Sequence, residues 1–125
     1  MKNNGFTFHK RIKSFGYAFN GIRLLIKNEP NAWIHCFATV CVLIAGILFR
    51  ISQLEWIAII FAIGSVFAAE AINSALEALA DYVSPEYQEA IKRTKDLAAG
   101  AVLFLAITSV IVGCIIFIPY IIRCF

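Results

Sequence analysis

The sequence predicts an all-α membrane protein in which three transmembrane helices follow an amino-terminal amphipathic helix. Of its 125 residues, 61% are hydrophobic and only 15% are charged, against about 25% charged residues in ordinary soluble domains. Three apolar stretches, residues 32–49, 54–80 and 97–122, approach or exceed the roughly 20 residues that cross a hydrocarbon layer. We therefore expect a single membrane-embedded domain over residues 1–125, and a water-soluble globular core is excluded.

Residues 7–28 are expected to form the amphipathic helix. Bulky apolar side chains recur there at steps of four and three residues, namely Phe8, Ile12, Phe15, Phe19, Ile22 and Ile26. Lysine and arginine occupy the other faces, a pattern typical of a helix that lies in the membrane interface. Gly16 and Gly21 are its candidate breaks. A helix packed on a soluble partner is the alternative, which the adjoining apolar spans disfavour.

Local sequence signals bound the three spans. Pro30 disfavours helical geometry at Glu29 and can begin the first span. Trp56, a residue favoured at membrane interfaces, stands near the start of the second span. Ser84-Pro85 marks the end of that helix. Residues 86–95 then form a short polar connection, with one or two helical turns, that leads into the third span.

The positive charges predict the orientation of the chain in its membrane. Most lysines and arginines precede the first span or lie between the second and the third: Lys2, Lys10, Arg11, Lys13, Arg23, Lys27, Lys92, Arg93 and Lys95. By the positive-inside rule, the amino terminus and residues 82–96 face the cytoplasm, and the turn near Arg50 faces the other side. These charges adjoin membrane spans and carry no nucleic-acid recognition motif, so a nucleic-acid partner is not expected. The first apolar run also begins too late for a signal peptide.

Cysteine and histidine give no metal or disulfide pattern. Cys36, Cys41, Cys114 and Cys124 form no C-x-x-C pair, and the first three are expected to be small apolar residues of the spans. His9 and His35 lack a second ligand at zinc-binding spacing. We expect His35 to hydrogen-bond within the helix bundle rather than to catalyse.

The stretch EAINSALEALAD, residues 70–81, places carboxylates inside or at the edge of an apolar span. At 3.6 residues per turn, Glu70, Asn73, Glu77 and Asp81 stand at offsets of three, seven and eleven and share one helix face. Alanines around them allow close approach of other helices. Because three helices can shield such a polar stripe only in part, a homo-oligomer is expected. A stripe that merely joins helices by hydrogen bonds is the alternative.

The cytoplasmic end of this stripe suits binding of a nucleotide. Glu29, Glu77 and Asp81 lie near the expected interface, where oxygen ligands could hold a magnesium ion on phosphate groups. Lys95 and Asp96, at the start of the third span, could respectively neutralise phosphate charge and accept bonds from a nucleotide. An ordinary charge pair at a helix start is the alternative for these two residues.

Glu70 is the candidate general base. It lies about 16 Å along the helix from Asp81, at 1.5 Å per residue, where burial favours proton abstraction from a lipid hydroxyl. The sequence has no G-x-x-x-x-G-K-[ST] loop and no protein-kinase signature. On residue types alone, a proton-coupled small transporter explains intramembrane glutamates equally well, and a non-enzymatic membrane subunit is a third possibility.

Four motifs, taken together, resemble the prokaryotic diacylglycerol kinase family, which includes undecaprenol kinases. They are Asn28-Glu29, EAINSALEALAD, PEYQ at residues 85–88 and KDLAAGAV at residues 95–102. The resemblance covers about residues 10–120. It implies a homotrimer, each chain with three transmembrane helices and a surface helix, in the bacterial inner membrane. The implied reaction transfers the γ-phosphate of Mg-ATP to the hydroxyl of a lipid alcohol.

The same resemblance assigns roles to residues of this chain. Glu70 falls on the catalytic-base position, and Glu29 and Glu77 fall on metal-linked positions. Further functional positions are matched by Asn73, Asp81, Lys95 and Asp96, and the nucleotide would be bordered by Tyr17, Glu86, Tyr87 and Gln88. An arginine expected near the amino-terminal helix aligns with Lys10, and Arg11 is adjacent, so the resemblance leaves open which of the two contacts phosphate.

The resemblance does not fix the lipid. Asn31, His35, Glu55-Trp56 and the IIFIPY segment are more similar to the undecaprenol kinase branch, whereas Asn73-Ser74 is similar to diacylglycerol kinases. Trp33 fits neither pattern. The expected product is therefore either undecaprenyl phosphate or phosphatidic acid.

Overall fold

The computed structural model describes residues 7–125 and contains four helices within them. They are α1 (Phe8–Asn28), α2 (Pro30–Phe49), α3 (Gln53–Val83) and α4 (Glu89–Cys124). In this part of the chain α2, α3 and α4 are long and apolar enough to cross a membrane. The predicted class, three transmembrane helices after an amino-terminal helix, is thus confirmed.

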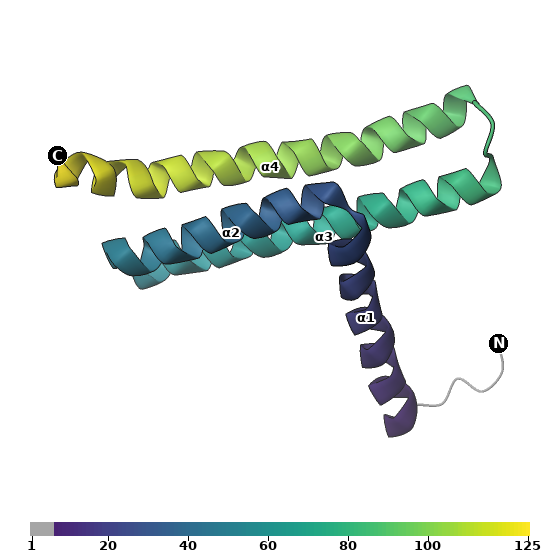
Figure 1. The fold of residues 1–125 in the computed structure, drawn as a ribbon, viewed down its shortest axis with the longest axis horizontal. Coiled ribbons are helices and arrows are strands. Elements are labelled where there is room, and N and C mark those ends of the chain that lie inside the picture. Colours follow the sequence, from purple (N-terminus) through teal and green to yellow (C-terminus); the bar gives the residue numbers. More distant parts are fainter. Residues whose placement is uncertain (1–6) are drawn as a thin grey trace.

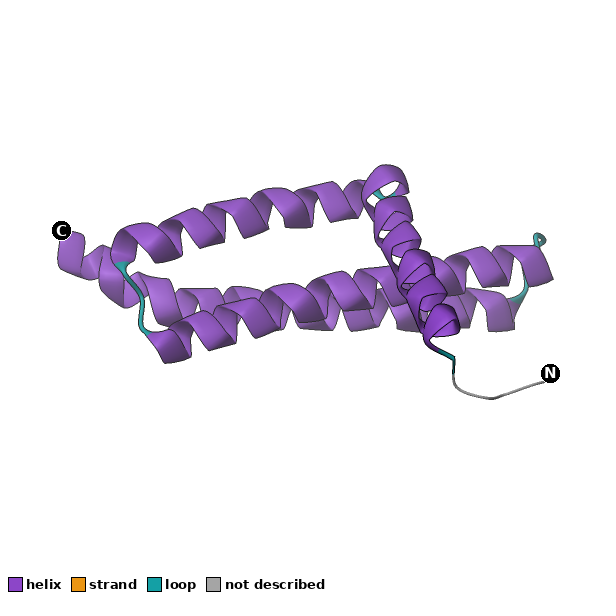
Figure 2. Cartoon of the chain, turned by 90° about the horizontal axis from the view of Figure 1, so that it is seen from below, coloured by secondary structure: helices purple, strands orange, loops and turns teal. Residues whose placement is uncertain are grey.

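The three long helices run alongside one another, and α1 projects from the bundle at a steep angle (Figure 1). The most extensive packing joins α3 to α4, whereas α2 and α1 make fewer contacts with α3. The α3–α4 hairpin continues beyond the point where α1 meets α2, as both views show (Figure 2). A membrane with α1 in its interface would therefore leave the α3–α4 connection in water.

Helix α1 is a single uninterrupted helix. The Thr7 side chain accepts a hydrogen bond from the Lys10 backbone N–H and caps its start. Gly16 and Gly21 do not break it, because an interior glycine costs only about 1 kcal/mol relative to alanine. At its end, Trp33 of α2 donates from Nε1 to the Ile26 carbonyl at 2.7 Å. This bond ties α1 to α2 across the Glu29-Pro30 bend.

Each short connection has a clear local cause. Arg50 ends α2 in the left-handed region, with φ of 53°. Ser52 and Glu55 then form a reciprocal capping box that starts α3. The Tyr120 hydroxyl donates to Glu55 at 2.6 Å and joins this end of α3 to α4. The turn thus fixes how α2 and α3 align as antiparallel neighbours.

Helix α4 begins earlier than the predicted span. Residues 86–95 were expected to be a polar connection with one or two helical turns, but one helix runs from Glu89 to Cys124. Polar side chains do not by themselves end a helix, and Glu, Ala, Lys and Arg, which open this segment, favour helical geometry. Pro119 lies inside α4 without ending it.

A buried apolar cluster lies at the end of the bundle near residue 51. Ile51, Ile59 and Ile116 are buried there and are covered by Trp56 and other apolar side chains. Gly46 of α2 faces this cluster, and a Cβ added to it would lie 2.6 Å from the Trp56 ring and 3.2 Å from Ile51 Cδ1. The Gly46 position therefore has no room for a side chain.

We expect Gly46→Ala to destabilise the protein, because overpacking a core typically costs about 1–3 kcal/mol. The measurement is the thermal unfolding midpoint of the purified protein in detergent. Gly64→Ala is the matched control, since a Cβ at Gly64 meets nothing within 4 Å. Equal midpoints for the two variants would contradict the close packing of α2 on this cluster.

Candidate active site

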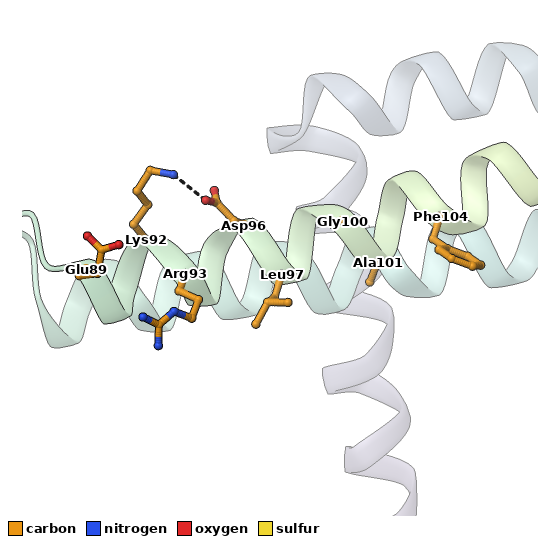
Figure 3. Close-up of a pocket in the computed structure, with 8 residues that line it drawn as sticks. All are labelled: Glu89, Lys92, Arg93, Asp96, Leu97, Gly100, Ala101 and Phe104. Carbon is orange, nitrogen blue, oxygen red and sulfur yellow. Dashed lines mark hydrogen bonds and ion pairs between the residues drawn. The ribbon is translucent and has the colours of Figure 1, made fainter.

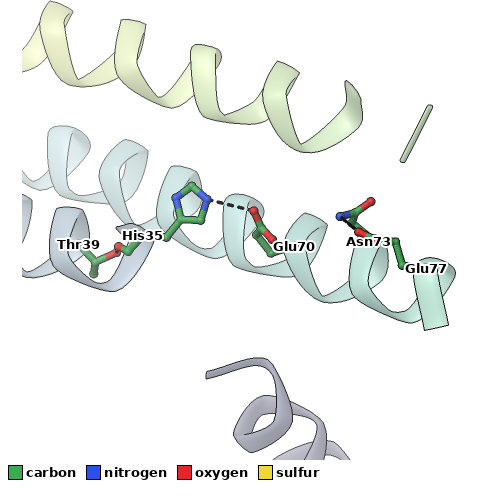
Figure 4. Close-up of polar contacts among 5 residues, drawn as sticks. All are labelled: His35, Thr39, Glu70, Asn73 and Glu77. Carbon is green, nitrogen blue, oxygen red and sulfur yellow. Dashed lines mark hydrogen bonds and ion pairs between the residues drawn. The ribbon is translucent and has the colours of Figure 1, made fainter. Parts of the chain in front are cut away.

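The predicted polar stripe exists on α3. Figure 4 shows Glu70, Asn73 and Glu77 in order along this helix, with His35 of α2 facing Glu70. Glu70 is buried, with 2% of its surface exposed, whereas Glu77 and Asp81 are exposed. The stripe therefore runs from the interior of the bundle toward the α3–α4 connection.

Glu70 is paired across the α2–α3 interface. His35 Nε2 lies 3.2 Å from Glu70 Oε1. Glu70 is also the one charged residue that is fully buried among the described residues. A buried carboxylate without a partner is strongly unfavourable in an apolar span, so this contact accounts for how the bundle accommodates it.

The next turn of the stripe holds oxygen atoms without protein partners. Asn73 Nδ2 donates to Glu77 Oε1 at 3.2 Å, but Asn73 Oδ1 and Ser74 Oγ are buried and have no hydrogen-bond partner. Glu29, at the bend between α1 and α2, lines a cavity of about 310 Å³ together with Ser74. Buried polar atoms usually find a partner, so these atoms are suited to receive a bound group.

The oxygen atoms along this part of α3 and at the α1–α2 bend are of the kind that magnesium prefers. Glu29, Asn73, Ser74 and Glu77 offer carboxylate, amide and hydroxyl oxygens, the atom type that this ion prefers. Among the described residues no three His, Cys, Asp or Glu side chains gather into a cage. Magnesium commonly uses one or two carboxylates and completes its coordination with phosphate and water. Glu29 and Glu77 each offer one such carboxylate, Glu29 in the cavity at the α1–α2 bend and Glu77 beside Asn73 outside the lining of that cavity.

Lys95 and Asp96 are adjacent but have different partners. Lys95 Nζ contacts Asp81 Oδ1 at 2.5 Å and links α4 to the end of the stripe. Asp96 instead pairs with Lys92 at 2.6 Å, one turn earlier on α4. Lys95 and Asp96 thus do not pair with each other, and each makes an ion pair of the ordinary kind, with Asp81 and Lys92 respectively.

Asp96 and Lys92 also line a hollow of about 570 Å³ on the outer face of α4, together with Arg93 (Figure 3). Its charged end lies near the start of α4, and Leu97 and Phe104 continue it along the helix. The charged end thus carries two cations and, with Glu89, two carboxylates, of which Lys92 and Asp96 are paired with each other.

The single chain does not gather every predicted nucleotide residue. Lys10, Arg11 and Tyr17 lie on α1, which points away from the bundle, whereas Glu86, Tyr87 and Gln88 lie in the connection at the far end of the α3–α4 hairpin. Tyr17 is 73% exposed, and the Tyr87 hydroxyl donates to Glu89. The two groups therefore remain on separate surfaces of one chain.

An apolar cleft of about 360 Å³ lies between α2, α3 and α4. Most of its lining is aliphatic or small, including Ala38, Ile63, Val66 and Gly113, and His35 also lines it. Since His35 also contacts Glu70, the cleft adjoins the buried carboxylate.

The sequence predicted that His35 hydrogen-bonds within the bundle, and its contact with Glu70 confirms this. Sequence reasoning named neither Glu70 as the partner nor the contact of Lys92 with Asp96. The spacing of four residues between Lys92 and Asp96 is a recognisable helical ion-pair signal. The His35 contact joins residues 35 positions apart and has no comparable local signal.

Comparison with known proteins agrees with this architecture. The family model described as prokaryotic diacylglycerol kinase matches residues 16–117. The undecaprenol kinase of Bacillus subtilis (strain 168) is 36% identical over 118 residues, which cover 94% of this chain and 96% of that protein. The diacylglycerol kinase of Escherichia coli (strain K12) is 31% identical over 116 residues, covering 93% and 95%. By both measures, this chain belongs to the prokaryotic diacylglycerol kinase family.

Proposed function

We propose that this protein is a membrane lipid kinase, which transfers the γ-phosphate of ATP to the hydroxyl group of a lipid alcohol. The observation that carries the proposal is the position of Glu70. This carboxylate is buried inside the bundle beside an apolar cleft, and a line of oxygen-bearing side chains leads from it toward water. A lipid hydroxyl and a nucleotide could thus approach the same point from opposite directions.

Glu70 would act as the general base. One carboxylate oxygen takes the proton of the lipid hydroxyl, the hydroxyl oxygen bonds to the γ-phosphorus, and the bond from that phosphorus to the β–γ bridging oxygen breaks. ADP leaves, and the lipid carries the phosphate. Burial in the bundle excludes water that would compete for the phosphoryl group.

Mg-ATP would bind at the water-exposed end of the stripe. Glu29 and Glu77 would hold magnesium, and the ion would neutralise negative charge on the phosphoryl group that is transferred. Asn73 supports this position through its bond to Glu77. Lys95, held by Asp81, is within the same region of the hairpin and would contact phosphate. Asp96, with Lys92, would border the nucleotide from α4.

Two lipid alcohols are the candidate substrates. The relatives carry the names undecaprenol kinase and diacylglycerol kinase, and relatives of both names reach 36% identity, so the preference between the lipids rests on the segments that resemble the undecaprenol kinase branch. The cleft beside Glu70 presents little polar surface besides His35, Thr39 and Ser109, which suits a hydrocarbon chain. We favour undecaprenol, with diacylglycerol as the second candidate.

A homotrimer would complete the site. Within one chain, Lys10, Arg11 and Tyr17 lie on α1, which points away from the α3–α4 connection that holds Glu86, Tyr87 and Gln88. The α1 helix of one copy beside the hairpin of another would bring them together. Association would also cover the polar stripe of α3.

We place the α3–α4 connection on the cytoplasmic side of the bacterial inner membrane, where ATP is present. In a background with the native cysteines replaced, a water-soluble maleimide applied to intact cells should label Gln53→Cys and should label Gln88→Cys only after the membrane is opened. The opposite pattern would put the proposed nucleotide site on the wrong side.

The proposed function is tested with purified protein in detergent, labelled ATP and three lipids: undecaprenol, diacylglycerol and ceramide. We expect magnesium-dependent transfer of label to undecaprenol or diacylglycerol. A folded protein that labels none of them, yet carries a solute with protons when reconstituted, would instead support the transporter alternative.

A further inference from the structure

His35 holds a position that the chemistry described above does not yet use. Its Nε2 lies 3.2 Å from Glu70 Oε1, and its side chain retains 22% exposure while that of Glu70 retains 3%. The histidine therefore reaches the buried carboxylate from the more open side of the α2–α3 interface. Among the described residues, His35 is also the one side chain that hydrogen-bonds to Glu70.

The imidazole ring is itself confined. Phe67 of α3 packs edge-on against it, with ring centroids 6.1 Å apart and planes at 76°. A ring restrained in this way offers the carboxylate a hydrogen bond of fixed direction, and such restraint is what a positioned catalytic group requires.

We propose that His35 is a positioning residue for Glu70. As a neutral imidazole it donates from Nε2–H to one carboxylate oxygen, which orients the other oxygen toward the lipid hydroxyl at the edge of the apolar cleft. The proton of that hydroxyl then passes to the second oxygen of Glu70, and His35 neither gains nor loses one. This inference rests on the proposed function.

The geometry sets the expected effect of removing the ring. In His35→Ala the Glu70 carboxylate loses its one side-chain partner and can rotate away from the acceptor. Misplacement of a reacting group by about 1 Å can cost on the order of 100-fold, so we expect kcat to fall by about 10- to 100-fold. The KM for Mg-ATP should stay close to wild type, since His35 lies at the buried end of the stripe.

Two further variants separate positioning from structural support. His35→Gln keeps an N–H donor on α2 and should recover a large part of the lost kcat. Cys36→Ala, one residue along the same helix, is the packing control and should match wild type. If His35→Ala proves too unstable to purify, His35→Gln and the double variant His35→Gln/Glu70→Gln still report on the contact between His35 and Glu70.

The decisive experiment is a double-mutant cycle on kcat with His35→Ala and Glu70→Gln. A residue that acts through Glu70 has nothing left to position once the base is gone, so the double variant should be about as slow as Glu70→Gln alone. An additional loss equal to that of His35→Ala in the wild-type background would overturn the proposal, as would full kcat in His35→Ala. Absence of lipid phosphorylation by the wild-type protein would instead contradict the proposed function.

Discussion

Replacing Glu77 with glutamine is expected to remove nearly all ATP-dependent lipid phosphorylation. The rate should fall at least about 100-fold at ordinary magnesium concentrations. Glutamine has almost the same shape and can still accept the bond from Asn73, so the helix and its neighbours should be undisturbed. What is lost is the negative charge that favours a divalent ion. Glu29→Gln should behave similarly, because the proposed function gives both carboxylates the same role toward the ion; Glu29 lines the cavity at the α1–α2 bend together with Ser74 of α3.

The measurement is the initial rate of lipid phosphorylation over a magnesium titration. Glu55→Gln is the matched control: it also removes a carboxylate from α3, but at the opposite end, where glutamine can keep the capping box and the bond from Tyr120. Wild-type turnover by Glu77→Gln at limiting magnesium would show that this carboxylate does not bind the ion.

Replacing Glu70 with glutamine is expected to lower the maximal rate by about 10²- to 10⁴-fold, equivalent to roughly 3 to 5 kcal/mol of activation free energy. A glutamine amide cannot accept the proton of the lipid hydroxyl at neutral pH, although its oxygen can keep the hydrogen bond to His35. Helix insertion and assembly should therefore be retained. The rate is measured with saturating lipid and Mg-ATP.

Glu70→Asp is the informative companion variant, because it retains a base but shortens the side chain by one methylene group. Its rate should lie between those of wild type and Glu70→Gln. If Glu70→Gln kept full turnover with saturating lipid, Glu70 would not be the base, and its burial would have to be explained by helix packing alone.

The sequence predicted the helices and the stripe because both depend on local periodicity. Glu70, Asn73 and Glu77 share a face of α3 for the same reason that the apolar residues of α1 do, namely the 3.6-residue repeat. Helix ends were less predictable. The polar residues after Gln88 look like a connection in the sequence, yet they continue α4 as a helix outside the apolar span.

The pairings between helices could not be predicted from spacing. Whether His35 lies opposite Glu70, and Lys95 opposite Asp81, depends on how far each helix slides past its neighbour. Arg50 and the Ser52–Glu55 capping box fix that alignment for α2 and α3, and Ser84-Pro85 with Gln88 does so for α3 and α4. Whether the predicted nucleotide residues of α1 meet those of the α3–α4 connection would depend on the proposed association between chains, which periodicity within one chain does not reveal.

We have proposed that Glu70 is the base and that Glu77 holds the metal ion. The most direct test of these separate roles measures Mg-ATP affinity and lipid turnover side by side for Glu70→Gln and Glu77→Gln in matched detergent samples. We predict that Glu70→Gln binds Mg-ATP like wild type but turns over slowly, because its loss is confined to proton transfer. Glu77→Gln should lose both affinity and turnover, since a metal ligand supports nucleotide binding as well. Equal loss of Mg-ATP affinity in the two variants would contradict the separation of a buried base from a metal site nearer the water.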